Sequence, residues 1–102
     1  MLRGITGDER IVDIIRLRLA IDFGITASRA IDFYADAHIA LADPEEYARI
    51  LLNIFGRGAS QILETIIIGL GDEFGLTTSE AMTLGDCIGA LQSAKAGDPA
   101  VR

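Results

Sequence analysis

Few side chains in this sequence of 102 residues are suited to acid–base or nucleophilic chemistry. The chain contains a single histidine, His38, and a single cysteine, Cys87. A protein zinc site uses several such ligands, and no second histidine or cysteine is present to complete one. A cysteine nucleophile needs a neighbouring base or cation to form its thiolate, and no histidine lies near Cys87 in the sequence. We therefore expect no metal site, and we expect Cys87 to pack as a small apolar side chain.

Paired carboxylates, which often carry out general acid–base catalysis, occur here as sequence neighbours: Asp8-Glu9, Glu45-Glu46 and Asp72-Glu73. Adjacent residues of a helix point about 100° apart, so such pairs are poorly placed to share a proton. Charges near helix ends are the better explanation for them. We assign no catalytic residue and expect that the protein is not an enzyme.

A glycine-rich stretch, TIIIGLGDEFG at residues 65–75, introduces the question of nucleotide binding. In dinucleotide-binding folds, such glycines let the backbone approach a pyrophosphate at a helix N-terminus. That fold needs a strand–helix–strand unit of about 30 residues, whereas the residues after Gly75 indicate one helix. We interpret the stretch as a helix whose small residues allow a neighbouring helix to approach closely.

Ser60 is the remaining candidate for chemistry. GASQILETIIIGLGDEFGL, Gly58–Leu76, followed by TLGDCIGAL, Thr83–Leu91, resembles the acyl carrier proteins, and Glu9–Ile25 is similar to the first helix of that family. The resemblance implies that Ser60 carries a 4′-phosphopantetheine arm, whose thiol passes acyl groups between partner enzymes. It also implies a helical bundle with an acidic surface, in keeping with the net charge of −6.

The chain departs from the family at four places. Thr65, Ile66 and Ile67 stand where the family often has carboxylates that dock basic partner surfaces. Ala59 and Gln61 replace the aspartate and leucine that flank the family serine. Residues 27–57 are longer than the family's loop, and the connection from Phe74 to Thr83 is shorter. The simpler interpretation of Ser60 is that its hydroxyl caps a helix.

LAIDFGITASRAIDF, residues 19–33, matches the spacing of a helix-turn-helix, with a turn at Gly24 and a buried Ile25. The second helix of this pair carries Asp32 and Asp36 against one arginine, which is unfavourable beside a polyanion. We therefore expect no nucleic acid partner, and DNA binding remains only the second alternative function.

Capping residues and apolar spacing predict an all-α protein of about five helices. Ile15–Phe23 alternates almost as a strand does, but the length of its run, about 15 residues, favours a helix. We expect the first helix to follow a cap at Asp8 and to extend from Glu9 to Phe23, and the second to extend from a cap at Thr26 or Ser28 to Leu41. The third should begin at Asp43-Pro44-Glu45-Glu46 and end at Gly56, and the fourth should extend from Ser60 to Phe74. The fifth should begin at a Thr77–Glu80 capping box and carry an apolar stripe of Ala81, Leu84, Ile88 and Leu91. In the second of these helices, we expect Ala30, Phe33, Ala37 and Leu41 to share the packed face.

A nine-residue pattern occurs twice, as FGITASRAI at residues 23–31 and FGLTTSEAM at residues 74–82. Each copy predicts a helix end at glycine, an aliphatic plug (Ile25 or Leu76) and a hydroxyl cap for the next helix. We therefore describe one domain over 1–102, with repeat-like halves at 7–41 and 58–92, a linking helix at 43–56 and a loose tail at 96–102. Shared helix-end chemistry explains part of the match, so a gene duplication remains open.

These observations favour a non-enzymatic carrier or adaptor that meets other proteins. The alternative is a helical homo-oligomer that associates through exposed aliphatic residues, because half of the residues are hydrophobic. No apolar run reaches the ~18 residues that a bilayer-spanning helix needs. The absence of a signal-like start and the single cysteine favour the cytoplasm.

Overall fold

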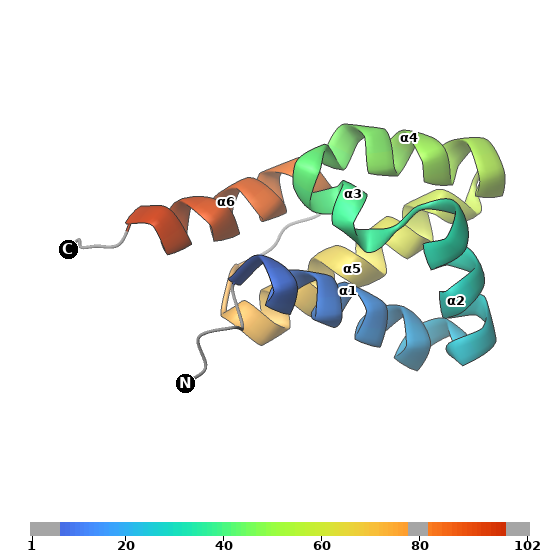
Figure 1. The fold of residues 1–102 in the computed structure, drawn as a ribbon, viewed down its shortest axis with the longest axis horizontal. Coiled ribbons are helices and arrows are strands. Elements are labelled where there is room, and N and C mark those ends of the chain that lie inside the picture. The colour runs from blue at the N-terminus through green and yellow to red at the C-terminus, as the bar shows by residue number, and fades with distance from the viewer. Residues whose placement is uncertain (1–6, 78–81, 98–102) are drawn as a thin grey trace.

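The computed structural model describes residues 7–77 and 82–97, with side chains of the last helix described as far as Ser93. These residues form an all-α protein, as predicted, and its six helices are shown in Figure 1. They are α1 (Gly7–Phe23), α2 (Ile25–Tyr34), α3 (Ala37–Ala42), α4 (Pro44–Phe55), α5 (Gly58–Phe74) and α6 (Leu84–Gly97). The described part of the chain contains no strand.

Helices α1 and α5 lie at the centre, and the other helices pack around them (Figure 1). Arg10 near the start of α1 pairs with Glu73 near the end of α5, so the two helices are antiparallel. Together they supply half of the buried apolar residues that the structure describes, and α2, α3, α4 and α6 supply nearly all of the others. The fully buried side chains include Ile15 and Leu19 of α1, Ile66 and Leu70 of α5, Tyr47 and Leu51 of α4, and Cys87 and Ile88 of α6.

A glycine of α5 makes room for a side chain of α1. A Cβ placed on Gly69 would lie well inside van der Waals contact with Cγ of Arg18. Gly69 is buried, and the stem of Arg18 occupies the space that a larger residue would take. The small residue at this position therefore lets a long side chain of the neighbouring helix pack across α5.

Helix α4 begins as its sequence predicts. Pro44 occupies the first turn, and the Asp43 carboxylate accepts a hydrogen bond from the backbone N–H of Glu46 at 3.2 Å. The helix ends at Gly56, which has a positive φ of 56°. Every signal for this helix comes from within its own few residues, so the sequence alone is sufficient to define it.

The second predicted helix is divided, which makes six helices rather than five. Helix α2 ends at Tyr34, and α3 begins at Ala37, because two aspartates cap the new helix. The Asp36 carboxylate accepts from the backbone N–H of His38 at 2.8 Å, and that of Asp32 accepts from Ala37 N–H at 3.0 Å. The predicted continuous face is therefore wrong: Ala37 is buried, but Phe33 is exposed.

The hydroxyl caps predicted at the starts of two helices are also wrong. Helix α5 already begins at Gly58, so Ser60 lies inside its first turn and donates to the carbonyl of Arg57 at 3.2 Å. Helix α2 begins immediately after Gly24 without a side-chain cap, and the Ser28 hydroxyl instead donates to the carbonyl of Arg16 at 3.3 Å.

The last helix starts later than the predicted Thr77–Glu80 box, of which Glu80 lies outside the described residues. Thr83 and Asp86 form the capping box instead. The Thr83 hydroxyl accepts from Asp86 N–H, and the Asp86 carboxylate accepts from Thr83 N–H, both at 3.0 Å. Helix α6 continues to Gly97, so residues 96 and 97 of the expected tail are helical, and residues 98–102 lie outside the description.

The two repeat-like halves begin with helices of the same length. Helices α1 and α5 each contain 17 residues and occupy matching positions in the two halves. The following helices do not match, since α2 starts one residue after Gly24 and α6 starts well beyond Gly75. Leu76 packs against the core as a plug, whereas the same prediction for Ile25 is wrong because this side chain is exposed.

Candidate functional site

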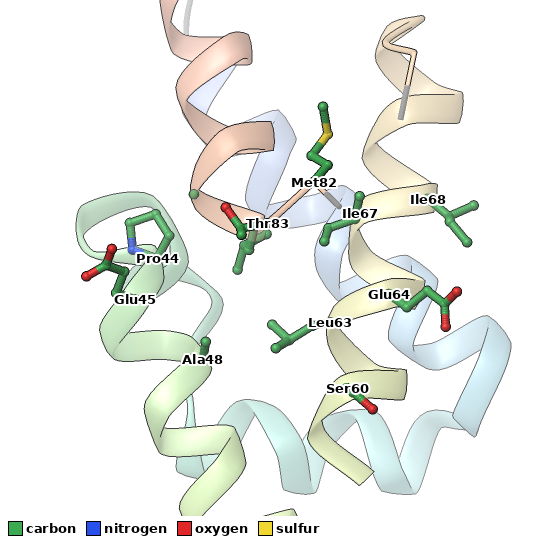
Figure 2. A pocket seen from close by; sticks show the side chains of 12 residues that line it. Pro44, Glu45, Ala48, Ser60, Leu63, Glu64, Ile67, Ile68, Met82 and Thr83 are labelled. Carbon is green, nitrogen blue, oxygen red and sulfur yellow. The ribbon is translucent and has the colours of Figure 1, made fainter. Parts of the chain in front are cut away.

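A cleft of about 930 Å³ opens between α4, α5 and the start of α6. Figure 2 shows Ala48 of α4 and Leu63 and Ile67 of α5 around the space between these helices. Met82 and Thr83, immediately before α6, lie at one end. Most of the lining is aliphatic, so the cleft is suited to an apolar group.

The cleft exists because the side chains at its edges are small. Ala48 faces it from α4, where a larger residue would extend toward Leu63. Gly85, in the first turn of α6, lies close to Pro44 of α4, since an added Cβ would be in ordinary van der Waals contact with the proline ring at 3.9 Å. The start of α6 thus lies beside the start of α4, while the space beside Ala48 stays open.

Acidic and hydroxyl groups surround this apolar lining. Glu45 lies on the outer side of α4, and Glu64 lies on the side of α5 that turns away from α4 in Figure 2. Ser60 occupies the margin of the cleft one helical turn before Glu64, with its side chain exposed. A ligand in the cleft would thus meet an aliphatic surface with negative charge on both sides.

Ser60 is accessible but is not activated as a nucleophile. In the described part of the chain, its hydroxyl has a hydrogen bond only to the Arg57 carbonyl. Among the described residues, no histidine or carboxylate accepts its proton, as a catalytic serine requires. The surroundings of the Ser60 hydroxyl therefore do not promote self-catalysed attack.

Cys87 and His38 lie apart from the cleft lining, in different environments. Cys87 is fully buried, which confirms its predicted role in the core, and burial raises the pKa of its thiol. His38 is exposed, and its Nδ1 lies 2.8 Å from an oxygen of Asp36. Among the described residues no nucleophile completes this histidine–aspartate pair, which therefore lacks the arrangement of a catalytic triad.

Long-range ion pairs around Arg16 were not predicted from the sequence. Its guanidinium contacts Asp32 at 3.1 Å and Asp36 at 3.4 Å, which joins α1 to the α2–α3 junction. Hydrogen bonds from the backbone and ring of His38 lower the pKa of Asp36. Tyr47 lies in the neighbouring core, where burial raises the pKa of its hydroxyl. The opposite charges of Arg16 and the two aspartates are visible in the sequence. Because these residues are 16 and 20 positions apart, the sequence alone does not show that they pair.

Other predicted binding modes have less support in the geometry. Gly69 and Gly71 lie inside α5, away from a helix N-terminus where a phosphate would bind. Only Gly24 separates α1 from α2, and Ile25 is exposed instead of filling the turn as the helix-turn-helix pattern predicts. Across residues 7–77 and 82–97, no group of three acidic, histidine or cysteine side chains is placed to hold a metal ion. The same residues include no helix long and apolar enough to cross a bilayer.

Comparison of the chain with protein-family models, with curated proteins and with solved structures yielded no match. The cleft and Ser60 are thus the features from which a function can be inferred.

Proposed function

We propose that this protein is a non-enzymatic carrier or adaptor that holds an aliphatic chain in the cleft between α4, α5 and α6. Ser60 is the proposed attachment residue for a 4′-phosphopantetheine arm, as the resemblance to acyl carrier proteins implies. The observation that supports this proposal is the position of Ser60, exposed at the margin of a cleft lined by Leu63 and Ile67.

The lining supplies the affinity that such a role needs. Each methylene buried against aliphatic side chains contributes about 0.8 kcal/mol before ordering costs are subtracted. Leu63 is partly buried and Ile67 is buried, so both are held by the fold while Ala48 leaves room opposite them. An acyl chain is a suitable occupant because it needs no hydrogen-bond partner inside the cleft.

The charges favour basic protein partners. Glu45 and Glu64 flank the cleft, and the whole chain has a net charge of −6. Complementary charge accelerates encounter and orients the partners more than it increases affinity. A reducing, cytoplasmic location suits this role, because it keeps Cys87 and the thiol of an attached arm reduced.

Intact-mass spectrometry tests the attachment. After incubation with coenzyme A and a phosphopantetheinyl transferase, we expect the protein to gain the mass of one arm. Ser60→Ala should abolish the gain, and Ser93→Ala, which changes an exposed serine on α6, should leave it unchanged. Absence of the added mass, or its persistence in Ser60→Ala, would contradict modification of Ser60.

The cleft is tested separately with a fluorescent medium-chain fatty acid. Ala48→Phe places a ring in the open space and should weaken binding, whereas Ala30→Phe alters an exposed alanine on α2 and should not. Binding that is equal in the two variants would show that the probe does not occupy this cleft.

A homo-oligomeric interaction protein remains the alternative function, and the observation that favours it concerns a different surface, on α1 and α2.

A further inference from the structure

Helix α1 carries apolar residues on two sides, and the fold covers one of them. Its buried side includes Ile11, Ile15 and Leu19, which pack in the core. Leu17 and Ile21, one turn apart, lie outside the core and are exposed. Leu17 and Ile21 are therefore apolar side chains that no neighbouring helix covers in the monomer.

Helix α2 extends this uncovered surface. Ile25 and Phe33 of α2 line a groove of about 730 Å³ together with Leu17 and Ala20 of α1. We define the α1–α2 face as Leu17, Ile21, Ile25 and Phe33, whose exposed fractions are 51%, 62%, 59% and 81%. The ring of Phe33 stands edge-on to that of Tyr34, with centroids 5.1 Å apart, so the most exposed residue has a defined direction.

The exposed area is large for a chain of this size. Leu17, Ile25 and Phe33 around the groove leave on the order of 400 Å² in water, within the range of the largest patch of a typical monomer. A stable pair buries about 800 Å² on each partner, which this face and its polar margin can supply. Isolated exposed leucines need no explanation, but Leu17, Ile25 and Phe33 line one groove, and exposed apolar residues gathered in this way indicate an interaction site.

The charges that line the groove identify the partner. They are Asp13 and Arg16 on α1 and Arg29 and Asp32 on α2, two acids and two bases, so the groove is locally neutral on an acidic protein. Arg29 is exposed and forms no ion pair within the described residues. A strongly basic partner would gain little electrostatic attraction from a groove that is neutral. A second copy brings an acid for each base of the groove and a base for each acid.

We propose that the α1–α2 face binds a second copy of this chain in a two-fold symmetric dimer, with Phe33 of each copy in the groove of the other. A two-fold axis makes each contact occur twice, so a projecting ring beside a groove is self-complementary. The same operation places Arg29 of each copy toward Asp13 of the other. The dimer uses α1 and α2, which do not line the α4–α5–α6 cleft, and so it is independent of the proposed carrier function.

Sedimentation equilibrium over micromolar to submillimolar concentrations provides the test. We expect a monomer–dimer equilibrium, and we expect Phe33→Asp to raise its dissociation constant by about 100-fold or more, as for a central anchor residue. The matched control is Leu52→Asp, which changes an equally apolar and 58% exposed side chain on α4 and should leave the equilibrium unchanged. Circular dichroism checks that both variants keep the helical content of the parent.

Charge reversal distinguishes a second copy from any other partner. Asp13→Arg and Arg29→Asp should each weaken the dimer by about 10-fold, because each variant places like charges together across the axis. The double variant restores both opposite-charge pairs and should recover most of the affinity. A strict monomer, an open-ended assembly, sensitivity to Leu52→Asp in place of Phe33→Asp, or no recovery in the double variant would overturn the proposal.

Discussion

The two copies of the Phe-Gly-aliphatic-Thr-x-Ser pattern begin alike and end differently. Gly24 has φ 93° and ψ 156°, and α2 starts at the next residue, so this glycine is a hinge between two helices. Gly75 is left-handed, with φ 73° and ψ 27°, and the N–H groups of Gly75 and Leu76 both donate to the Gly71 carbonyl. This second arrangement is a helix stop of the Schellman type.

The difference lies in the residue after the glycine. Leu76 packs against the core, whereas Ile25 is exposed and contributes to the α1–α2 face. One pattern therefore produces a sealed helix end in the second half and an uncovered apolar surface in the first. Similar local sequences specify a similar interruption, but tertiary packing decides the direction of the chain after it.

The largest effects should come from matched core leucines in the two halves. Leu19 of α1 and Leu70 of α5 occupy equivalent positions, and both are buried. We expect Leu19→Ala and Leu70→Ala each to lower the free energy of unfolding by about 3 kcal/mol, through lost transfer energy and an added cavity. Urea unfolding followed by circular dichroism measures both. If one variant lost much more unfolding free energy than the other, α1 and α5 would contribute unequally to the stability of the core.

The two glycines should differ in their tolerance of a side chain. Gly24 lies in a region that is essentially restricted to glycine, so Gly24→Ala should cost about 2–3 kcal/mol. Gly75 is left-handed, where alanine is strained by about 1–2 kcal/mol. No atom lies within 4 Å of an added Cβ at either position, so backbone strain alone determines the result. Equal costs in thermal or urea unfolding would argue against two distinct turns.

The residues after the glycines should differ as well. Leu76→Ser removes a side chain that packs against the core and should cost about 1–2 kcal/mol. Ile25→Ser should change the stability of the monomer by less than about 0.5 kcal/mol, because its side chain is already exposed. Chemical unfolding at a concentration low enough to populate monomers measures this contrast. A large loss in Ile25→Ser would place that side chain in the core.

The smallest effect concerns the break between α2 and α3, which the second half lacks. Asp36 caps α3, and its sequence equivalent in the second half is Cys87, buried inside α6. Asp36→Ala should cost about 1 kcal/mol at neutral pH, as for other helix N-caps.

This contribution should depend on pH. Hydrogen bonds from His38 lower the pKa of Asp36 in the folded state, so the carboxylate stabilises the fold above its unfolded pKa of about 4. The contribution is lost as the pH falls through the lower folded value. Unfolding curves between about pH 2 and pH 6 should therefore converge for the parent and Asp36→Asn at the acid end. Parallel curves would exclude Asp36 as the titrating group.

Elements with local signals were predictable from the sequence. The α4 helix is set by Asp43 and Pro44 within a single turn, and the all-α class follows from the apolar spacing. The break at Ala35-Asp36 was missed because Phe33, Ala37 and Leu41 keep a helical spacing across it. The capping aspartates, Asp32 and Asp36, were a local signal for the break. Ser60 was wrongly predicted to cap α5 because the helix begins two residues earlier, at Gly58.

The candidate site was predictable only in part. Ser60 was a candidate from its sequence context and lies at the margin of the cleft, but the cleft itself depends on where Ala48 and the start of α6 come to lie. The exposed α1–α2 face was hidden for a similar reason. Phe33 belongs to an apolar stripe that predicted a packed face, whereas its side chain is exposed.

The contact between Arg18 and Gly69 has a consequence for the relation between the halves. The two residues occupy equivalent positions in α1 and α5, so the antiparallel pair approximates an internal two-fold axis that passes near this contact. Two arginines there would meet each other, and two glycines would leave a void. The contact instead pairs a large residue, Arg18, with a small one, Gly69. Because the two differ in size, the sequence of one half could not replace that of the other at this contact. A chain built from two identical halves could not pack its centre in this way.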